Sequence, residues 1–185
     1  MGLNIEDGIG KGYQAKVNDE NMLATYSIID SKEAHTNIVH GASYNMLFSQ
    51  TPSAAADCFL YIKNEDDHTM ILEGIAANVA TDEYIEVVLN DVGTPVGGTS
   101  VTPTNLNAGV NNVADGTFQT GPDITGLSGG NTAFRIFYEG GAATKYFNFD
   151  QDIIVPKNRI LTLYCVTGSI LIEGFLSFFF HEGYS

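Results

Sequence analysis

With 185 residues, of which 44% are hydrophobic, the chain is long enough and apolar enough to fold as a single domain around a buried core. Its formal net charge of −14 reflects 22 acidic residues against 8 lysines and arginines. This excess of negative charge argues against binding to nucleic acids and to anionic membranes, because both require basic surfaces on the protein.

The first residues, 1–12, are polar, acidic and rich in glycine, which predicts an extended arm. They lack the basic start and apolar centre of a signal peptide, so we expect a protein that is made and used without secretion. The glycines around Lys11 resemble a phosphate-binding loop. However, no strand precedes them and the spacing of such a loop is missing, which favours the arm.

Beyond the arm, alternating apolar and polar residues separated by turn residues predict about eight to ten short strands. Gly74 marks an expected bulge, Pro156–Asn158 an expected turn, and the last two apolar segments an expected hairpin at the centre of a sheet. Short helical turns are weakly indicated at residues 31–39 and 53–57. The expected strand segments are residues 22–29, 42–49, 58–63, 70–79, 84–89, 133–138, 145–149, 153–155, 159–166 and 169–181, and residues 13–17 form either a short first strand or part of the arm.

Residues 91–131 form a long polar excursion rich in Gly, Thr and Asn, within a stretch between Lys63 and Arg135 that has no lysine or arginine. A structureless loop of this length is uncommon inside a compact domain. Isolated apolar residues recur through the excursion, which predicts short extended segments whose apolar side chains pack against the rest of the domain. A flexible loop is the alternative. These residues are Val101, Leu106, Val110, Phe118, Ile124 and Leu127.

Many short strands with turns between them are typical of a β-sandwich or jelly roll. We therefore predict an all-β, single-domain β-sandwich that is jelly-roll-like. The sandwich is expected over residues 13–185, with the excursion 91–131 inside it and the arm 1–12 before it.

Residues with metal-binding or nucleophilic chemistry are sparse and scattered. The four histidines lack the spacing of a zinc motif. The acidic residues 65–67 after Asn64 offer oxygen ligands for calcium, but consecutive carboxylates in a tight turn cannot all face one ion, which favours a solvated hairpin turn. Cys58 and Cys165 lie in strand-like segments. We favour the interpretation that they are buried thiols, and a disulfide between them is the alternative.

No residue pattern indicates catalysis. Neither cysteine has a neighbouring histidine, and there is no Gly-x-Ser-x-Gly motif around a serine nucleophile. A pair of converging glycosidase carboxylates remains open as an alternative, although the chain has no tryptophan for a sugar platform. We therefore expect a protein that is not an enzyme and has no catalytic residues, metal or cofactor.

Several stretches resemble a known family of proteins. They are Ala15–Val17 with Leu23 and Asn37, the turn Gly41–Tyr44, the strand end Leu60–Asn64, and the excursion segments Val101–Gly109 and Asp123–Gly130. On these stretches, the chain resembles virion structural proteins of tailed bacteriophages, especially those that decorate or cement the capsid. The resemblance implies a β-sandwich or jelly roll that assembles as a homotrimer on the outside of the capsid lattice.

The partners implied are further copies of this chain and the major capsid protein, with no nucleic acid and no membrane. The implied location is the capsid surface, after synthesis in the host cytoplasm. A host-binding module of a tail, fibre or baseplate is the first alternative, and a β-sandwich carbohydrate-active enzyme is the second. The residues expected to contact a partner are Ile5, Lys11, Tyr13, Leu106, Phe118, Ile124, Leu127 and Tyr184.

Overall fold

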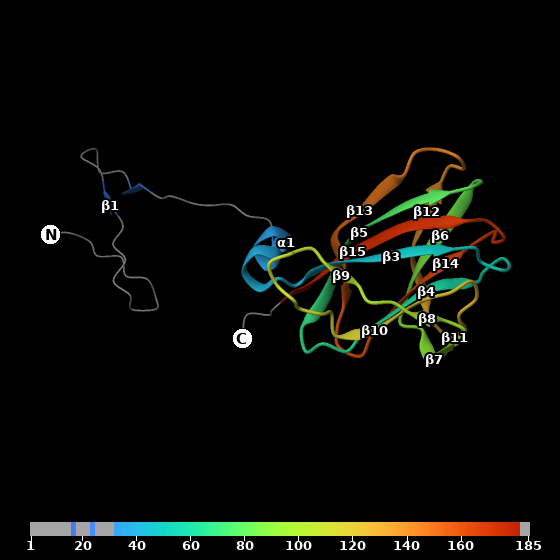
Figure 1. Ribbon diagram of the computed structural model, residues 1–185, viewed down its shortest axis with the longest axis horizontal. Coiled ribbons are helices and arrows are strands. Elements are labelled where there is room, and N and C mark those ends of the chain that lie inside the picture. The colour runs from blue at the N-terminus through green and yellow to red at the C-terminus, as the bar shows by residue number, and fades with distance from the viewer. Residues whose placement is uncertain (1–15, 18–22, 25–31, 182–185) are drawn as a thin grey trace. The chain divides into compact units, whose positions relative to one another are not determined.

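The computed structural model (Figure 1) describes residues 16–17, 23–24 and 32–181. The chain divides into two units, residues 1–31 and 32–185. In the first unit, the described residues form two short strands, β1 (Lys16–Val17) and β2 (Leu23–Ala24), which pair antiparallel. The expected arm, residues 1–12, lies outside the described residues and stays a prediction.

The second unit begins with a helical segment and continues almost entirely in strands. The segment consists of α1 (Lys32–His35) and the π-helix η1 (Thr36–His40), and it ends at Gly41, whose φ of 58° is left-handed. It matches the helical turn expected near residues 31–39, whereas residues 53–57 form a turn without helix. The strands are β3 (Ser43–Gln50), β4 (Cys58–Asn64), β5 (Thr69–Val79), β6 (Glu83–Leu89), β7 (Val92–Val96), β8 (Thr99–Ser100), β9 (Thr104–Asn105), β10 (Gly116–Thr120), β11 (Thr125–Ser128), β12 (Asn131–Tyr138), β13 (Lys145–Val155), β14 (Ile160–Cys165) and β15 (Ile172–His181).

Two antiparallel sheets pack against each other (Figure 1), so the all-β sandwich is confirmed. One sheet has the strand order β12-β6-β14-β4-β10-β8 and the other β13-β5-β15-β3-β9. The eight longest strands pair in a nested way: β3 with β15, β4 with β14, β5 with β13, and β6 with β12. A long hairpin rolled up in this way has the strand order of a jelly roll.

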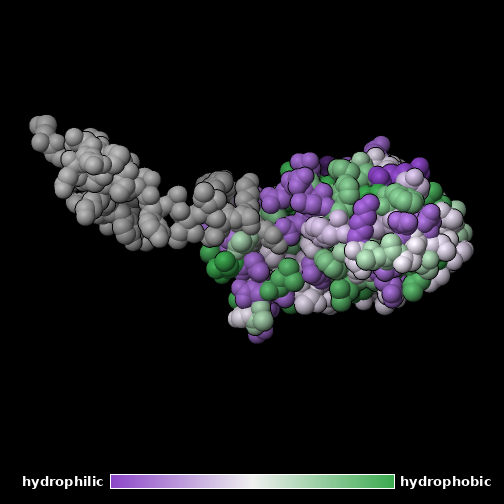
Figure 2. Space-filling view, turned by 90° about the horizontal axis from the view of Figure 1, so that it is seen from above, coloured by the Kyte–Doolittle hydropathy of each residue, from purple (hydrophilic) through white to green (hydrophobic). Residues whose placement is uncertain are grey.

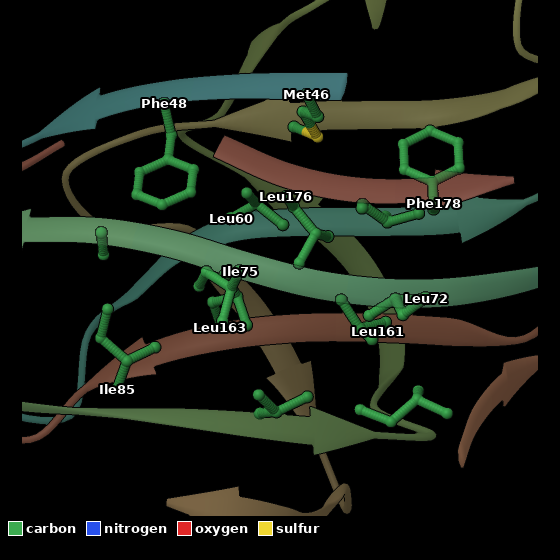
Figure 3. Close-up of a cluster of buried hydrophobic side chains, with 14 of the residues drawn as sticks. Met46, Phe48, Leu60, Leu72, Ile75, Ile85, Leu161, Leu163, Leu176 and Phe178 are labelled. Carbon is green, nitrogen blue, oxygen red and sulfur yellow. The ribbon is translucent and has the colours of Figure 1, made fainter. Parts of the chain in front are cut away.

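The core fills the space between the two sheets with apolar side chains from both (Figure 3). On β3, Met46 and Phe48 point inward and Leu47 points outward, which is the period-two alternation that the sequence displays. On the central strand β15, Leu176 and Phe178 meet them from the same sheet. Leucines of β4 and β14 close the core from the opposite sheet (Figure 3).

The prediction that residues 159–166 and 169–181 form a hairpin is wrong. β14 lies between β6 and β4 in one sheet, and β15 lies between β5 and β3 in the other. Each segment is rich in apolar residues, and each lies at the centre of its own sheet. The connection between them crosses from sheet to sheet. The buried carboxylate of Glu83 accepts hydrogen bonds there from the backbone N–H groups of Thr167 (2.9 Å) and Gly168 (3.0 Å).

Three local predictions can be compared with the strands. The pairing of β5 with β15 shifts register beside Gly74, which confirms the expected bulge. Asn158 has a left-handed φ of 62° in the expected turn. Segments 145–149 and 153–155 are one strand, β13, rather than two, because Asp150 and Gln151 adopt left-handed backbone conformations that bulge the strand without ending it.

The polar excursion contains the expected short extended pieces. Its strand β10 adds to the six-stranded sheet beside β4, and β9 adds to the five-stranded sheet beside β3. β7, which precedes β8, and β11, which follows β10, pair as a separate two-stranded antiparallel sheet. In Figure 1 these two strands lie below β4 and β8, and α1 lies at the left-hand end of the sandwich. The excursion is therefore part of both layers of the fold.

Candidate functional site

The residues expected to contact a partner fall into three groups. Leu106 is exposed at 41% of its surface, and Leu127 is half-buried. Phe118 and Ile124 are buried within the domain. Their burial corrects the expectation that they form a contact surface, because their side chains hold the excursion onto the sheets. The expected residues outside the described part of the chain are Ile5, Lys11, Tyr13 and Tyr184.

Phe118 and Ile124 pin the excursion at two different places. Phe118 on β10 stacks on Phe178 in the main core, with ring centroids 5.7 Å apart. Ile124 packs with Cys58 and Tyr61 on the outer face of the six-stranded sheet, and Leu127 packs against that cluster. β11 and the residue directly before it therefore cover part of this outer face with apolar side chains.

The outer face of the five-stranded sheet carries an apolar row that no segment of the described chain covers fully. Register places Leu47, Phe175, Ala76 and Tyr146 side by side across β3, β15, β5 and β13. Leu47 is exposed at 61% and Tyr146 at 49% of its surface. The rings of Tyr146 and Phe175 lie 6.5 Å apart. We call these four residues the apolar row.

Polar side chains border the apolar row on both sides. One neighbouring line includes Ser49, which donates a hydrogen bond to Glu173 (2.8 Å). The other includes Ser177, which donates to Asn45 (2.8 Å). An apolar centre with a polar rim is the usual anatomy of a protein–protein interface. In the view of Figure 2, hydrophobic residues occur in small groups separated by hydrophilic ones.

The bulge glycine is what lets Tyr146 lie against the sheet. A Cβ atom at Gly74 would be 2.4 Å from the ring atom Cζ of Tyr146 and 2.6 Å from the backbone oxygen of Phe147. Any larger residue would push the tyrosine ring away. Gly74 thus links the backbone irregularity that the sequence predicts to the shape of the apolar row.

A second group of exposed apolar side chains lies at the α1 end of the sandwich. Asn107 donates a hydrogen bond to the backbone oxygen of Asn37 (2.8 Å), and Asn112 donates to that of His40 (2.8 Å). These bonds tie the loop after β9 to η1. The end patch, as we call it, consists of exposed side chains on the two joined segments: Ile38, Val39, Leu106 and Val113.

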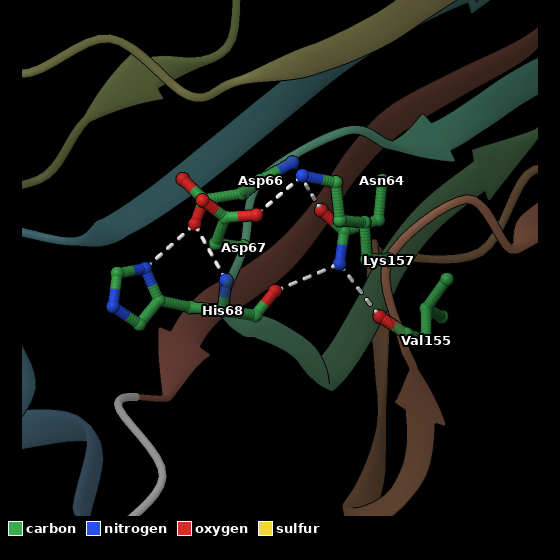
Figure 4. Close-up of polar contacts among 6 residues, drawn as sticks. All are labelled: Asn64, Asp66, Asp67, His68, Val155 and Lys157. Atoms are coloured by element: carbon green, nitrogen blue, oxygen red, sulfur yellow. Dashed lines mark hydrogen bonds and ion pairs between the residues drawn. The ribbon is translucent and has the colours of Figure 1, made fainter. Parts of the chain in front are cut away.

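The acidic turn after β4 is held by contacts within the chain (Figure 4). Asp66 accepts a bond from the backbone N–H of His68 (2.7 Å), and its Oδ1 lies 2.6 Å from the Nδ1 of His68. Asp67 pairs with Lys157, which lowers the pKa of the Asp67 carboxyl. The carboxylates therefore point in separate directions, as expected for a hairpin turn. Among the described residues, no group of three or more His, Cys, Asp or Glu side chains is placed to hold a metal ion.

Histidines that are far apart in the sequence meet in one pocket. His40 and His68 line a pocket of about 270 Å³ together with Tyr44 and Asn112, and the ring of His35 lies 5.8 Å from that of His40. Sequence reasoning missed this grouping, since it depends on where η1 and the β4–β5 turn lie in the fold. No short-range pattern signals it.

Cys58 and Cys165 are buried, free thiols. Burial raises the pKa of Cys58 to about 12 and that of Cys165 to about 11. Both thiols are therefore protonated and poor nucleophiles near neutral pH, because the thiolate is the reactive form. This agrees with the favoured interpretation of two buried thiols.

No family model matches the chain, no curated protein matches its sequence, and no solved structure matches its fold. Neither short helical segment in the described part of the chain has the length and apolarity that crossing a bilayer requires.

Proposed function

We propose that this chain is a decoration or cement protein that binds the outside of a tailed-bacteriophage capsid as a homotrimer. The observation that supports this most is the apolar row with its polar rim on one face of a jelly roll. A row across four strands spans about 14 Å, which suits the apolar centre of an interface that buries roughly 800 Å² on each partner.

The proposed trimer uses two different patches on each copy. A closed ring of three subunits has head-to-tail contacts, in which one patch meets another that differs from it. The apolar row supplies one patch and the end patch the other. Both lack charged side chains at their centres, so they allow strongly acidic chains to approach one another at these points.

Binding of the trimer would stabilise the capsid shell through the thermodynamic linkage between binding and assembly. A protein that binds the assembled shell, and not its separated subunits, shifts the equilibrium toward the shell. We assign this contact to the arm, residues 1–12, with major capsid protein as the partner. The trimer would bring three arms to neighbouring capsid subunits, which raises the overall affinity by multivalency.

The test is the binding of purified protein to undecorated shells of the phage that encodes it. Full-length chain is expected to sediment with the shells and to raise their melting temperature. A chain that lacks residues 1–12 is expected to stay folded and trimeric but to remain in the supernatant. If the shortened chain still saturates the shells, the arm is not the contact. If the full-length chain does not bind shells, the proposed function is wrong.

A host-binding module of a tail, fibre or baseplate is the second candidate. It is favoured by the exposed apolar side chains of Val92 and Val96 on β7, which lie at the surface of the excursion. Immunogold labelling of intact virions separates the two candidates. Label distributed over the whole shell supports decoration, whereas label confined to the tail supports host binding.

A further inference from the structure

β12 forms one edge of the six-stranded sheet, and β6 is its only hydrogen-bonded neighbour among the described strands. An edge strand presents a row of backbone N–H and C=O groups that can pair with a further extended chain. Proteins usually protect such edges with very short strands, bulges, prolines or charged side chains. The two large sheets have four edges, β12, β8, β13 and β9, and these differ in their protection.

Three of the four edges are protected. β8 and β9 are only 2 residues long each, so they offer little backbone to a partner. β13 bulges at Asp150 and Gln151, whose left-handed φ angles are 51° and 65°, and its pairing with β5 shifts register there. It also carries the charged side chains of Lys145 and Asp152. Each of these strands is therefore a poor template for a further strand.

β12 lacks this protection over its second half. Its pairing with β6 shifts register only between Thr132 and Phe134, and it continues regularly from there to Tyr138. The strand contains no proline, and its one charged residue is Arg135. The guanidinium of Arg135 lies 2.7 Å from the carboxylate of Glu86 on β6, so its charge is balanced by the neighbouring strand. The second half of β12 is therefore a regular and open template.

The hydrogen-bonding pattern shows which backbone groups of β12 face the open side. The backbone oxygen of Tyr84 on β6 accepts a bond from the N–H of Val166, on the side away from β12. Tyr84 lies opposite Phe137, so these two residues form a pair without mutual hydrogen bonds. In agreement, the backbone oxygen of Phe137 accepts a bond from the side chain of Lys145 (3.2 Å). By the alternation of antiparallel strands, the backbone groups of Arg135 face the open side as well.

Exposed aromatic side chains and an arginine lie beside this edge on the outer face of the sheet. Tyr84 and Phe137 are exposed at 42% and 40% of their surfaces, and their ring centroids are 5.1 Å apart. The guanidinium carbon of Arg135 lies 5.6 Å from the centroid of the Tyr84 ring. Tyrosine, phenylalanine and arginine are enriched at protein–protein interfaces. An added strand would place alternate side chains against this group, because side chains of paired strands lie side by side.

The open edge lies in an acidic part of the surface. Glu139 directly follows β12, and Asp82 accepts a hydrogen bond (2.8 Å) from the backbone of the same loop. Asp150 on β13 follows Phe149, whose ring contacts that of Phe134 on β12 with centroids 5.4 Å apart. All three carboxylates are exposed, and the chain as a whole has a net charge of −14. A partner with basic side chains is therefore electrostatically complementary to this edge.

We propose that the open edge of β12 binds an extended, basic segment of another protein, which adds to the six-stranded sheet as a further strand. Backbone hydrogen bonds to Arg135 and Phe137 supply affinity, and side chains that pack on the aromatic pair supply specificity. This contact uses the six-stranded sheet, whereas the apolar row lies on the five-stranded sheet. It therefore does not depend on the proposed decoration function.

The experiment titrates the isotopically labelled full-length chain with a short synthetic peptide of alternating valine and lysine. The amides of Arg135 and Phe137 are expected to shift saturably, with a dissociation constant of about 1 mM or lower, and to exchange hydrogen more slowly. The control peptide has glutamate in place of every lysine and is expected to bind at least about tenfold more weakly. The proposal is overturned if the lysine peptide does not bind, if it binds away from β12, or if the glutamate peptide binds equally well.

Two substitutions at one position separate backbone pairing from charge. Arg135→Pro removes the outward N–H group, and an edge strand tolerates proline where that group faces solvent. Arg135→Thr removes the same charge and keeps the N–H. The threonine variant is expected to bind the lysine peptide at least about fivefold more tightly than the proline variant. Equal binding by the two folded variants would overturn the proposal. If the proline variant does not fold, unchanged hydrogen exchange at Arg135 and Phe137 in peptide-saturated wild type would overturn it.

Discussion

The outer faces of the two sheets differ in how their apolar side chains are covered. On the six-stranded sheet, Ile124 and Leu127 of the excursion pack onto Cys58 and Tyr61. On the five-stranded sheet, the apolar row leaves Leu47 and Tyr146 about half exposed or more. The excursion therefore covers part of the outer face of the six-stranded sheet, where Tyr84 and Phe137 stay partly exposed, whereas no segment of the described chain fully covers the apolar row on the other sheet. The uncovered face is the one that we assign to contacts between copies.

The largest expected effect comes from the Asp91 carboxylate, which joins the start of β7 and the segment after β11 to β14. Asp91→Ala removes the carboxylate that accepts hydrogen bonds from the hydroxyls of Thr162 and Tyr164. Both hydroxyls are then left inside the protein without this partner. Its loss is expected to lower the free energy of unfolding by about 3 kcal/mol. Urea denaturation measures the change. Asp123→Ala, at an exposed carboxylate just before β11, is the control and is expected to change stability by less than about 0.5 kcal/mol.

A smaller effect, still on the covered face, is expected from Ile124→Ala. Ile124 is buried in the cluster with Cys58 and Tyr61, so its truncation is expected to cost about 2 kcal/mol of stability. Leu47→Ala on the uncovered face is the matched comparison and is expected to cost less than about 0.5 kcal/mol in the separated subunit. Equal losses in the two variants, by urea denaturation at low protein concentration, would remove the distinction between the faces.

Gly74→Ala is expected to act on the uncovered face through Tyr146. The added methyl group is placed 2.4 Å from the tyrosine ring and 2.6 Å from a backbone oxygen, so the ring must move. We expect a loss of stability of about 1 kcal/mol, by thermal denaturation, together with weaker self-association. A variant with unchanged melting and unchanged self-association would show that Gly74 does not shape the row. Gly109→Ala is the control, because Gly109, like Gly74, has no positive φ, is exposed, and its new methyl would come no closer than 3.2 Å to another atom.

The smallest change in stability at neutral pH is expected from the titration of Cys58, which affects stability only at alkaline pH. Because its pKa is raised by burial from 9.0 to about 12, the stability that it contributes is complete below pH 9 and is lost as the pH rises toward 12. Wild type is therefore expected to lose stability over this window, and Cys58→Ala to lose less of it over the same range. Denaturation curves at several pH values measure the two slopes; parallel slopes would exclude Cys58 as the cause.

Local patterns in the sequence predicted the strands well, because side-chain alternation and turn residues act over a few neighbours. Tyr44, Met46 and Phe48 of β3 and the bulge at Gly74 are examples. The pairing of the last two strands was not predictable in this way. Nested pairing in a jelly roll joins β14 to β4 and β15 to β3 across most of the chain. Adjacency in sequence favoured a hairpin instead.

The candidate site was harder to predict from the sequence than the fold was. Apolar residues in a polar excursion signal either a contact surface or an anchor, and only the structure shows that Phe118 and Ile124 are anchors. The apolar row depends on the register of four strands, so Leu47 and Tyr146 carry no signal of their own. Their strands are separated in the sequence, and side-chain alternation does not say which outer face stays open.

The oligomeric mass of the full-length chain tests the central claim most directly. Sedimentation velocity compares wild type with Leu47→Thr/Tyr146→Thr, which keeps β-forming side chains but removes the apolar surface. Val113→Thr changes the end patch, and Leu171→Thr is an exposed control outside both patches. We expect a trimer for wild type and Leu171→Thr, and monomers for the double variant and for Val113→Thr. A monomeric wild type, or a trimer that persists in the double variant, would contradict the assignment of the uncovered face to self-assembly.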